Sequence, residues 1–137
     1  MNMDDRVLYW IEIAEYDIET AQAMLESRRF LYVAFMCHQA IEKMLKAYHQ
    51  LSTNDMPPKT HNLLSLFDKT GLLVKLDQDQ SAFLDILNPL NVQVRYPEYR
   101  ERILKTLSNE RAKEILLKTE ELFEWLKREL LKKQGSM

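Results

Sequence analysis

Two short strings of the sequence combine residue types that can do chemistry. Cys37 to Ala47 places polar side chains along one line of a helix that otherwise has the composition of a core helix. Arg95, Tyr96 and Pro97 put an arginine where a helical pattern stops, because the residue before a proline is pushed out of helical backbone. Together the two strings indicate a polar groove on a helical bundle.

Phosphate binding is the chemistry that the two lysines of the first string suggest. Glu42 lies four residues before Lys46, and side chains at this spacing face each other on a helix. One interpretation is a solvent-facing row of Glu–Lys pairs, each contributing about 0.2–0.5 kcal/mol to helix stability. The other is the floor of a groove in which Lys43 or Lys46 contacts a phosphate. Spacing alone favours the solvent-facing row.

Lys59, Thr60 and His61 come just before the predicted third helix. A helix start offers free backbone N–H groups and a partial positive charge, so these residues can hold the edge of a phosphate. The alternative is a capping turn in which the histidine ties the loop to its neighbours. Arg95 also has two interpretations. Its guanidinium can bind an anion through two parallel N–H groups, or its charge can simply compensate the dipole at the end of the helix. Tyr96 beside it can stack on a base or fill a gap.

Familiar metal and nucleotide motifs are missing from the sequence. The single Cys37 excludes an intramolecular disulfide and a zinc site built on several cysteines, and we expect a small buried thiol. His38, His49 and His61 lack the spacing of a zinc motif. The sequence also contains no P-loop, no dinucleotide-binding fingerprint and no nucleophile elbow of the serine hydrolases. We therefore expect neither a metal nor a cofactor.

Length and charge limit the function classes further. The 137 residues suit one domain, expected over residues 1–134, with a frayed, disordered tail at 135–137. A net charge of −2 argues against a broad, non-specific nucleic-acid surface but allows a local basic pocket. The N-terminus is acidic where a secretory signal would be basic, and no apolar run approaches the roughly 20 residues that span a bilayer. We expect a cytoplasmic protein without a membrane segment.

The hydrophobic pattern predicts an all-α fold, an up-and-down helical bundle of four main helices with one or two short helices. The main helices are expected near residues 5–27, 30–51, 77–95 and from 108 onward, and the short ones near 60–71 and 98–107. Thr60 is the expected N-cap of the third helix, and Pro89 either kinks the fourth or begins a new turn. The second helix should be central, because its apolar face covers about half of its circumference. Its opposite side is expected to carry the polar residues His38, Gln39, Glu42, Lys43, Lys46 and His49.

The strings resemble the HEPN domain family (higher eukaryotes and prokaryotes nucleotide-binding) over nearly the whole chain. The matching residues are Trp10, Ala14, Asp17, Ala21 and Leu25, then His38 to Ala47, Lys59 to Leu63, and Arg95 to Pro97. The resemblance implies an up-and-down helical bundle that is commonly dimeric. Many members are encoded beside a minimal nucleotidyltransferase and act with it as a toxin–antitoxin pair, and several are metal-independent ribonucleases.

The ribonuclease motif of that family is an arginine followed, after four to six residues, by a histidine. Arg95 matches the arginine, but the histidine positions hold Arg100, Glu101 and Arg102. The usual acid–base partner for attack by a 2′-hydroxyl is therefore missing. The missing histidine favours a binding protein over an enzyme and leaves the question of activity open. The residues expected to bind its ligand are Arg95, Tyr96, Glu42, Lys43, Lys46, His61 and Lys59.

Three functions stay open on the sequence. The first is a non-catalytic HEPN-like protein that binds a nucleotide or RNA phosphate, a partner nucleotidyltransferase, or both. The second is a metal-independent ribonuclease with a non-standard acid–base group, such as His61 or His38. The third is a helical adaptor without a small ligand. We also expect a homodimer, and large aromatic residues on a polar side mark its candidate interface: Trp10, Phe30, Tyr32 and Phe35.

Overall fold

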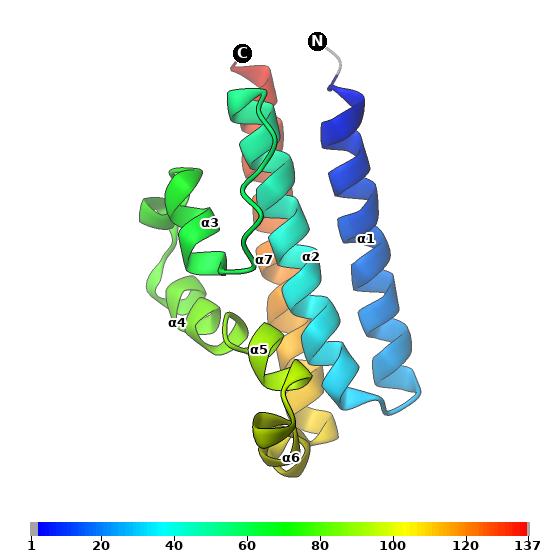
Figure 1. Ribbon diagram of the computed structural model, residues 1–137. Coiled ribbons are helices and arrows are strands. Elements are labelled where there is room, and N and C mark those ends of the chain that lie inside the picture. The colour runs from blue at the N-terminus through cyan, green and yellow to red at the C-terminus, as the bar shows by residue number, and fades with distance from the viewer. Residues whose placement is uncertain (1–2, 137) are drawn as a thin grey trace.

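Three long helices run side by side through the computed structural model, which describes residues 3–136 (Figure 1). They are α1 (Asp5–Glu26), α2 (Phe30–Thr53) and α7 (Asn109–Gly135). No strand occurs among the described residues, which confirms the all-α prediction. Residues 1–2, and residue 137 of the predicted tail, lie outside the described part of the chain.

The short helices gather on one side of α2 (Figure 1). They are α3 (Leu63–Lys69), the 3₁₀ helix η1 (Leu73–Lys75), α4 (Gln78–Leu87), α5 (Leu90–Arg95) and α6 (Pro97–Thr106). The helix predicted over residues 77–95 is thus divided, and Pro89 is the N-cap of α5. Proline interrupts the helix here because it has no N–H to donate to the preceding turn. α6 lies at the end of the molecule where α1 turns into α2, opposite the two chain termini (Figure 1).

Side-chain caps explain where several of these helices start. Asp4 caps α1 by accepting from the backbone of Arg6, and Ser108 caps α7. At α4, Asp77 and Gln80 form a reciprocal capping box that satisfies two backbone N–H groups.

The prediction that Thr60 caps the third helix is wrong. Asn62 is the cap, and its side chain accepts a hydrogen bond of 3.2 Å from the backbone N–H of Ser65. The hydroxyl of Thr60 accepts instead from the N–H of Asn62, at 3.1 Å, which closes a short turn before the helix. Thr60 and Asn62 are both residue types that cap helices, and asparagine is the stronger N-cap of the two.

The prediction that the polar side of α2 faces solvent is wrong in the middle of the helix. His38, Glu42 and Lys46 are 0%, 3% and 8% exposed. α2 contacts α1 and α7 and is also covered by α3 and α5. A helix enclosed in this way buries polar side chains, and burial is tolerated where such groups satisfy one another. The polar line of α2 is therefore an internal network.

None of the helices within residues 3–136 combines the length and the apolar character needed to cross a membrane.

Candidate functional site

A pocket of about 380 Å³ opens between the start of α3 and the junction of α4 with α5. We call it the α3–α5 pocket. Its lining residues are His61, Asn62, Asn88, Pro89, Asn91, Val92, Arg95 and Tyr96. The fold thus brings His61 to the same hollow as Arg95 and Tyr96, although the sequence separates them by two helices.

Asparagines form the fixed wall of the pocket. The side-chain oxygen of Asn88 accepts from the backbone N–H of Leu63 at 2.7 Å, and its amide donates to Asn62 at 3.3 Å. Asn91 is buried and accepts from the amide of Gln39 on α2 at 3.3 Å. These bonds tie the start of α3 and the α4–α5 junction to each other and to α2. The wall is therefore held in place before any ligand arrives.

Arg95 stands at the rim with its charge uncompensated. The guanidinium carbon lies 5.4 Å from the centre of the Phe35 ring on α2. No carboxylate within residues 3–136 comes within ion-pairing distance of it. A cation–π contact of this kind does not use the N–H groups of the guanidinium, so they are available to an anion. Arg95 and the neighbouring Tyr96 are both exposed.

A buried carboxylate stands behind the pocket. Both oxygens of Glu42 lie next to the Nδ1 atom of His61, at 2.9 and 3.0 Å, and one of them accepts from the Nζ atom of Lys46 at 3.1 Å. The Glu42 side chain is 4% exposed and the His61 side chain 49%. A carboxylate at Nδ1 favours the tautomer that carries the proton there, so that a neutral His61 presents Nε2 as an acceptor. No hydrogen bond from within residues 3–136 occupies Nε2.

His38 lies on the inner side of the same carboxylate, with 3.8 Å between its Nδ1 atom and the nearer oxygen of Glu42. Neither of its ring nitrogens has a hydrogen bond within the described chain. Burial lowers the pKa of His38 to about 4, since desolvation outweighs the attraction of Glu42. His38 is therefore neutral at physiological pH, and it does not line the pocket.

The predicted lysines lie away from the pocket. Lys43 forms a 2.7 Å ion pair with Asp17 of α1, whose pKa is raised by burial and lowered by this partner. Lys46 pairs with Glu42, and its Nζ atom lies 5.7 Å from the centre of the Trp10 ring. Lys59 is exposed on the loop before α3 and is not among the lining residues. Of the residues predicted to bind a ligand, the pocket unites Arg95, Tyr96 and His61, and Glu42 supports it from behind.

Sequence reasoning missed the asparagines, although a signal for them was present. Asn88, Asn91 and Arg95 are spaced by three and four residues, so they share one face of a helix or of two helices in continuous register. Small polar residues on the face of an arginine are typical of a binding wall rather than of a core. The pairing of Glu42 with His61 had no comparable signal, because it joins a helix to a loop. No set of three or more His, Cys, Asp or Glu residues within 3–136 is arranged to hold a metal ion.

The comparisons with known proteins show the family of the chain and a protein of similar fold. The family model described as the HEPN domain matches residues 7–130, nearly the whole chain. The chain belongs to the HEPN domain family. The crystal structure of TT1696 from Thermus thermophilus is similar, with a TM-score of 0.77 and 21% sequence identity over 91% of this chain and 98% of that one. At this identity the likeness shows that the two proteins share a fold. No curated protein matches the chain.

Within this HEPN domain, the positions that replace the histidine of the ribonuclease motif lie outside the pocket. Arg100, Glu101 and Arg102 are exposed on α6 and do not line it. His61, from the loop that precedes α3, is the histidine that lines the pocket together with Arg95.

Proposed function

We propose that this HEPN protein binds the phosphate of a nucleotide or of RNA in the α3–α5 pocket. The observation that carries the proposal is the guanidinium of Arg95. It lies over the Phe35 ring, has no carboxylate partner within residues 3–136, and lines a pocket together with His61. A bidentate guanidinium is the side chain best suited to a phosphate. A protonated His61 supplies a second donor through Nε2, and Tyr96, which is 51% exposed, supplies a face for a base.

Three other pockets have similar volumes, about 350–380 Å³, and each has a carboxylate in its lining. One of them is strongly acidic and does not suit an anion. It lies between α1 and α7 and is lined by four glutamates, Glu15, Glu19, Glu120 and Glu124, with one lysine, Lys127. Its charge repels phosphate, whereas the α3–α5 pocket contains a cation and no carboxylate among its lining residues. This difference in charge supports the proposal of a phosphate site in the α3–α5 pocket.

Calorimetric titration with uridine monophosphate and short single-stranded RNAs tests the proposal. Arg95→Ala removes charge-assisted hydrogen bonds worth about 1.5–3 kcal/mol, so affinity should fall about 10- to 100-fold. Arg128→Ala is the matched control, because it removes the same charge from an exposed position of α7 outside the pocket. Equal affinities of Arg95→Ala and the wild type would remove Arg95 from the site. Binding of no nucleotide or RNA at all would leave a helical adaptor.

A second candidate function is metal-independent cleavage of RNA, and the contact between Glu42 and His61 is the observation that favours it. A carboxylate that holds an imidazole by Nδ1 leaves Nε2 free to take a proton. In the pocket, His61 would take the proton of a 2′-hydroxyl as its oxygen attacks the neighbouring phosphate held by Arg95. A 2′,3′-cyclic phosphate would form, the bond from phosphorus to the 5′-oxygen would break, and water would protonate the leaving 5′-oxygen. His38 does not fit this role, since it is fully buried.

Cleavage assays in EDTA decide between binding and catalysis. The ribonuclease candidate predicts a product that persists in EDTA, is lost in His61→Ala and Arg95→Ala, and is unchanged in His49→Ala. Tight binding of RNA without any cleavage would leave the non-catalytic function.

The proposal also includes a homodimer and a partner protein, and both rest on family membership. HEPN proteins are commonly dimeric, and many act with a minimal nucleotidyltransferase as a toxin–antitoxin pair. We accordingly propose a cytoplasmic homodimer with a partner of that class. Of the residues suggested for its interface, Trp10 donates to Gln50 at 2.9 Å and Phe35 lies under Arg95, whereas Tyr32 is 45% exposed. Light scattering at micromolar concentration should give the mass of two chains, and the mass of one chain would contradict the dimer.

A further inference from the structure

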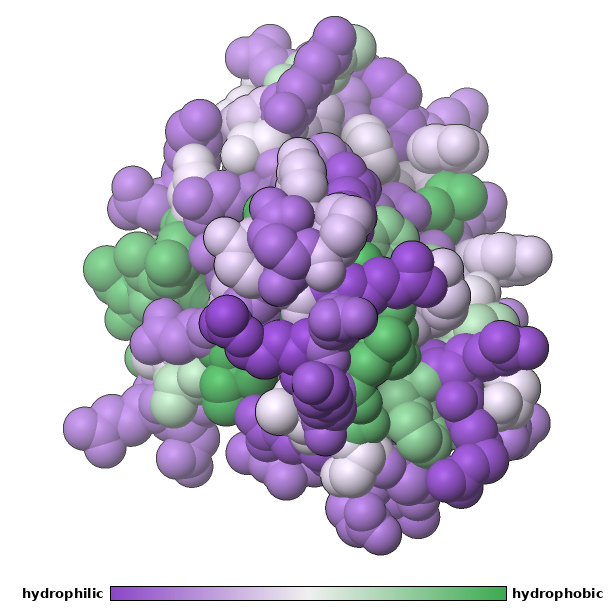
Figure 2. Space-filling model, turned by 60° about the horizontal axis from the view of Figure 1, so that its bottom comes forward, coloured by the Kyte–Doolittle hydropathy of each residue, from purple (hydrophilic) through white to green (hydrophobic). Residues whose placement is uncertain are grey.

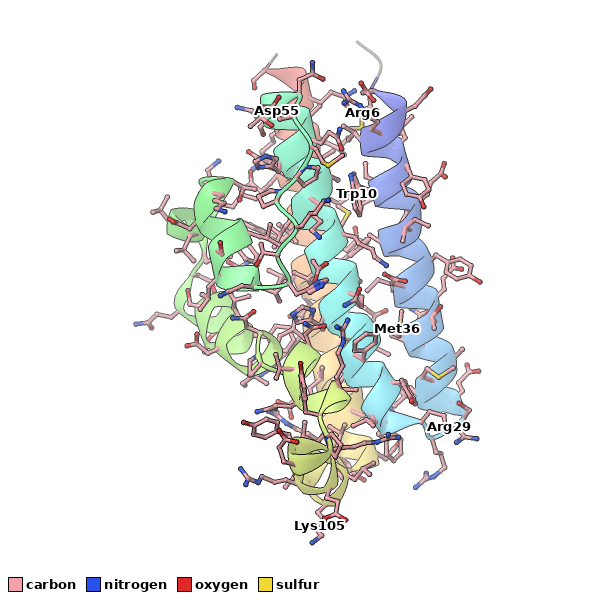
Figure 3. The ribbon with its side chains drawn as sticks, in the orientation of Figure 1. Arg6, Trp10, Arg29, Met36, Asp55 and Lys105 are labelled. Carbon is pink, nitrogen blue, oxygen red and sulfur yellow. The ribbon has the colours of Figure 1, made fainter. Side chains whose placement is uncertain are left out.

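A second groove, of about 230 Å³, lies where the turn between α1 and α2 meets α6. We call it the Arg28–Arg100 groove. Three arginines and five largely apolar residues line it: Arg28, Arg29, Arg100, Phe30, Leu31, Tyr32, Leu104 and Leu107. No Asp or Glu is among them. Figure 2 turns this end of the molecule forward and shows hydrophilic side chains around smaller hydrophobic areas, and Figure 3 places Arg29 and Lys105 at this end.

Uncompensated arginines are concentrated on this part of the molecule. Five of the eight arginines of the chain lie at the α1–α2 turn, at the end of α5 or on α6: Arg28, Arg29, Arg95, Arg100 and Arg102. None of the five pairs with a carboxylate within residues 3–136, although α6 also carries the exposed Glu98 and Glu101. Since the net charge of the chain is −2, this cationic region is a local feature. Such segregation attracts an anionic partner.

Arg28 has a backbone conformation that is unusual for an arginine. Its φ of 62° lies in the left-handed region, where glycine or asparagine is usual and a longer side chain is strained. Its guanidinium carbon lies 5.2 Å from the centre of the Phe30 ring, so the side chain is held at the groove. A glycine would make the same turn with less strain. The fold alone therefore gives no reason for an arginine here.

Two helices connect the groove to the α3–α5 pocket. On α2, Tyr32 lines the groove and Phe35 lies under Arg95, and residues three apart are neighbours on one helix face. On α6, the backbone N–H of Arg100 donates to the carbonyl of Tyr96 at 3.0 Å, so the two residues are one turn apart. Tyr96 lines the pocket and Arg100 lines the groove. Tyr96 of the pocket and Arg100 of the groove are therefore about one helical turn apart, ~5 Å along α6.

We infer that the Arg28–Arg100 groove binds a second phosphate of a single-stranded RNA whose first phosphate is held by Arg95. This inference rests on the proposed function and defines its ligand as a strand of several nucleotides. Each site combines arginine with an exposed aromatic ring, since Tyr96 of the pocket is 51% exposed and Tyr32 of the groove 45%. Cations that follow a backbone and rings that stack on unpaired bases are how proteins hold single strands.

A second copy of the chain is a poorer occupant of the groove, although Phe30 and Tyr32, two of the residues suggested for a dimer interface, line it. A two-fold contact centred on the groove brings the same surface of both copies together. It would therefore place Arg28, Arg29 and Arg100 against the same three arginines, with no carboxylate in the lining to separate them. Like charges placed together at an interface oppose association.

The test compares uridine monophosphate with a single-stranded hexauridylate on the full chain, at several salt concentrations. The variants are Arg28→Gly and Arg100→Gln, with Arg128→Gln as the control outside the groove. Each groove variant should weaken hexauridylate binding roughly threefold to tenfold and lower the salt slope of its binding constant by about 0.7. Both variants should bind uridine monophosphate as the wild type does. Arg28→Gly should melt at the same or a higher temperature, so its binding loss is not a loss of folding.

Each outcome separates this inference from the proposed function. Binding of uridine monophosphate, combined with hexauridylate binding that neither groove variant weakens, would overturn the groove and leave the Arg95 site standing. An equal loss in Arg128→Gln would also overturn it, because the effect would then be one of net charge. A duplex RNA that binds as tightly as the single strand would refute the single-strand assignment. Failure of both ligands to bind would remove the proposed function itself.

Discussion

Replacement of Glu42 by glutamine removes the charge on which the polar network of α2 depends. The Glu42 carboxylate is 4% exposed and faces the Nζ atom of Lys46 at 3.1 Å and the Nδ1 atom of His61 at 2.9 Å. Glutamine keeps the volume of the side chain and one carbonyl oxygen. It leaves the cation of Lys46, whose side chain is 10% exposed, without a counter-ion.

Removing one partner of a buried ion pair costs about 3–5 kcal/mol. We place Glu42→Gln near the lower end, at about 3 kcal/mol, because Lys46 retains a cation–π contact with Trp10 at 5.7 Å. For a domain of this size, such a loss lowers the melting temperature by roughly 10 °C. Lys46→Met should cost a similar amount, since it leaves the carboxylate with His61 alone.

Urea unfolding followed by tryptophan fluorescence measures these free energies of unfolding. Glu12→Gln is the matched control, because Glu12 is exposed on α1 and forms no ion pair within the described chain. In the double variant Glu42→Gln with Lys46→Met, the loss should be clearly smaller than the sum of the two single losses. A loss below about 0.5 kcal/mol for Glu42→Gln, or additive losses in the cycle, would refute the buried pair.

Three further predictions concern folding. The pKa of His38 in the folded protein is about 4, below its ordinary value of 6.5, so the unfolded chain binds a proton at a higher pH than the folded chain does. About 3 kcal/mol of folding stability, present above pH 6.5, should therefore be lost as the pH falls to 4. Urea titrations at several pH values measure this loss, and it should be smaller in His38→Leu. Cys37 is fully buried and burial raises its pKa to about 12, so a thiol reagent should label it only in urea, and rapid labelling of the native protein would contradict its burial. Gly71 has a φ of 77°, so Gly71→Ala should destabilise the protein by about 1 kcal/mol, whereas Gly135→Ala should not; equal stabilities would contradict the strain.

The helices were predictable because their signals are local. Asp77 with Gln80 marks the start of α4, and the proline after Tyr96 marks the end of α5. Periodicity identified the central helix α2, since its apolar face exceeds what a surface helix needs. The start of α3 was misjudged because Thr60 and Asn62 are both capping residues, and only the turn between them shows which one caps the helix.

The polar network was not predictable, since it joins residues that are distant in the sequence. Helical periodicity predicts that Glu42 and Lys46 lie on a solvent-exposed face of α2. It contains no information that α3 and α5 cover that face. The partner of Lys43 is Asp17 on another helix, so a spacing of four residues gave no hint of it. Arg95 was proposed from the sequence because its position at a helix end before a Tyr-Pro pair is a local signal. The phenylalanine that its guanidinium contacts comes from α2 and had no such signal.

The most direct test of the phosphate site is an NMR titration of the isotope-labelled chain with uridine monophosphate. We predict saturable shifts of the Arg95 Nε–H signal and of the His61 ring signals with one common dissociation constant, and no shift at Arg128. Saturable binding that leaves the Arg95 signal in place, or that moves Arg128 equally, would contradict a phosphate site in the α3–α5 pocket.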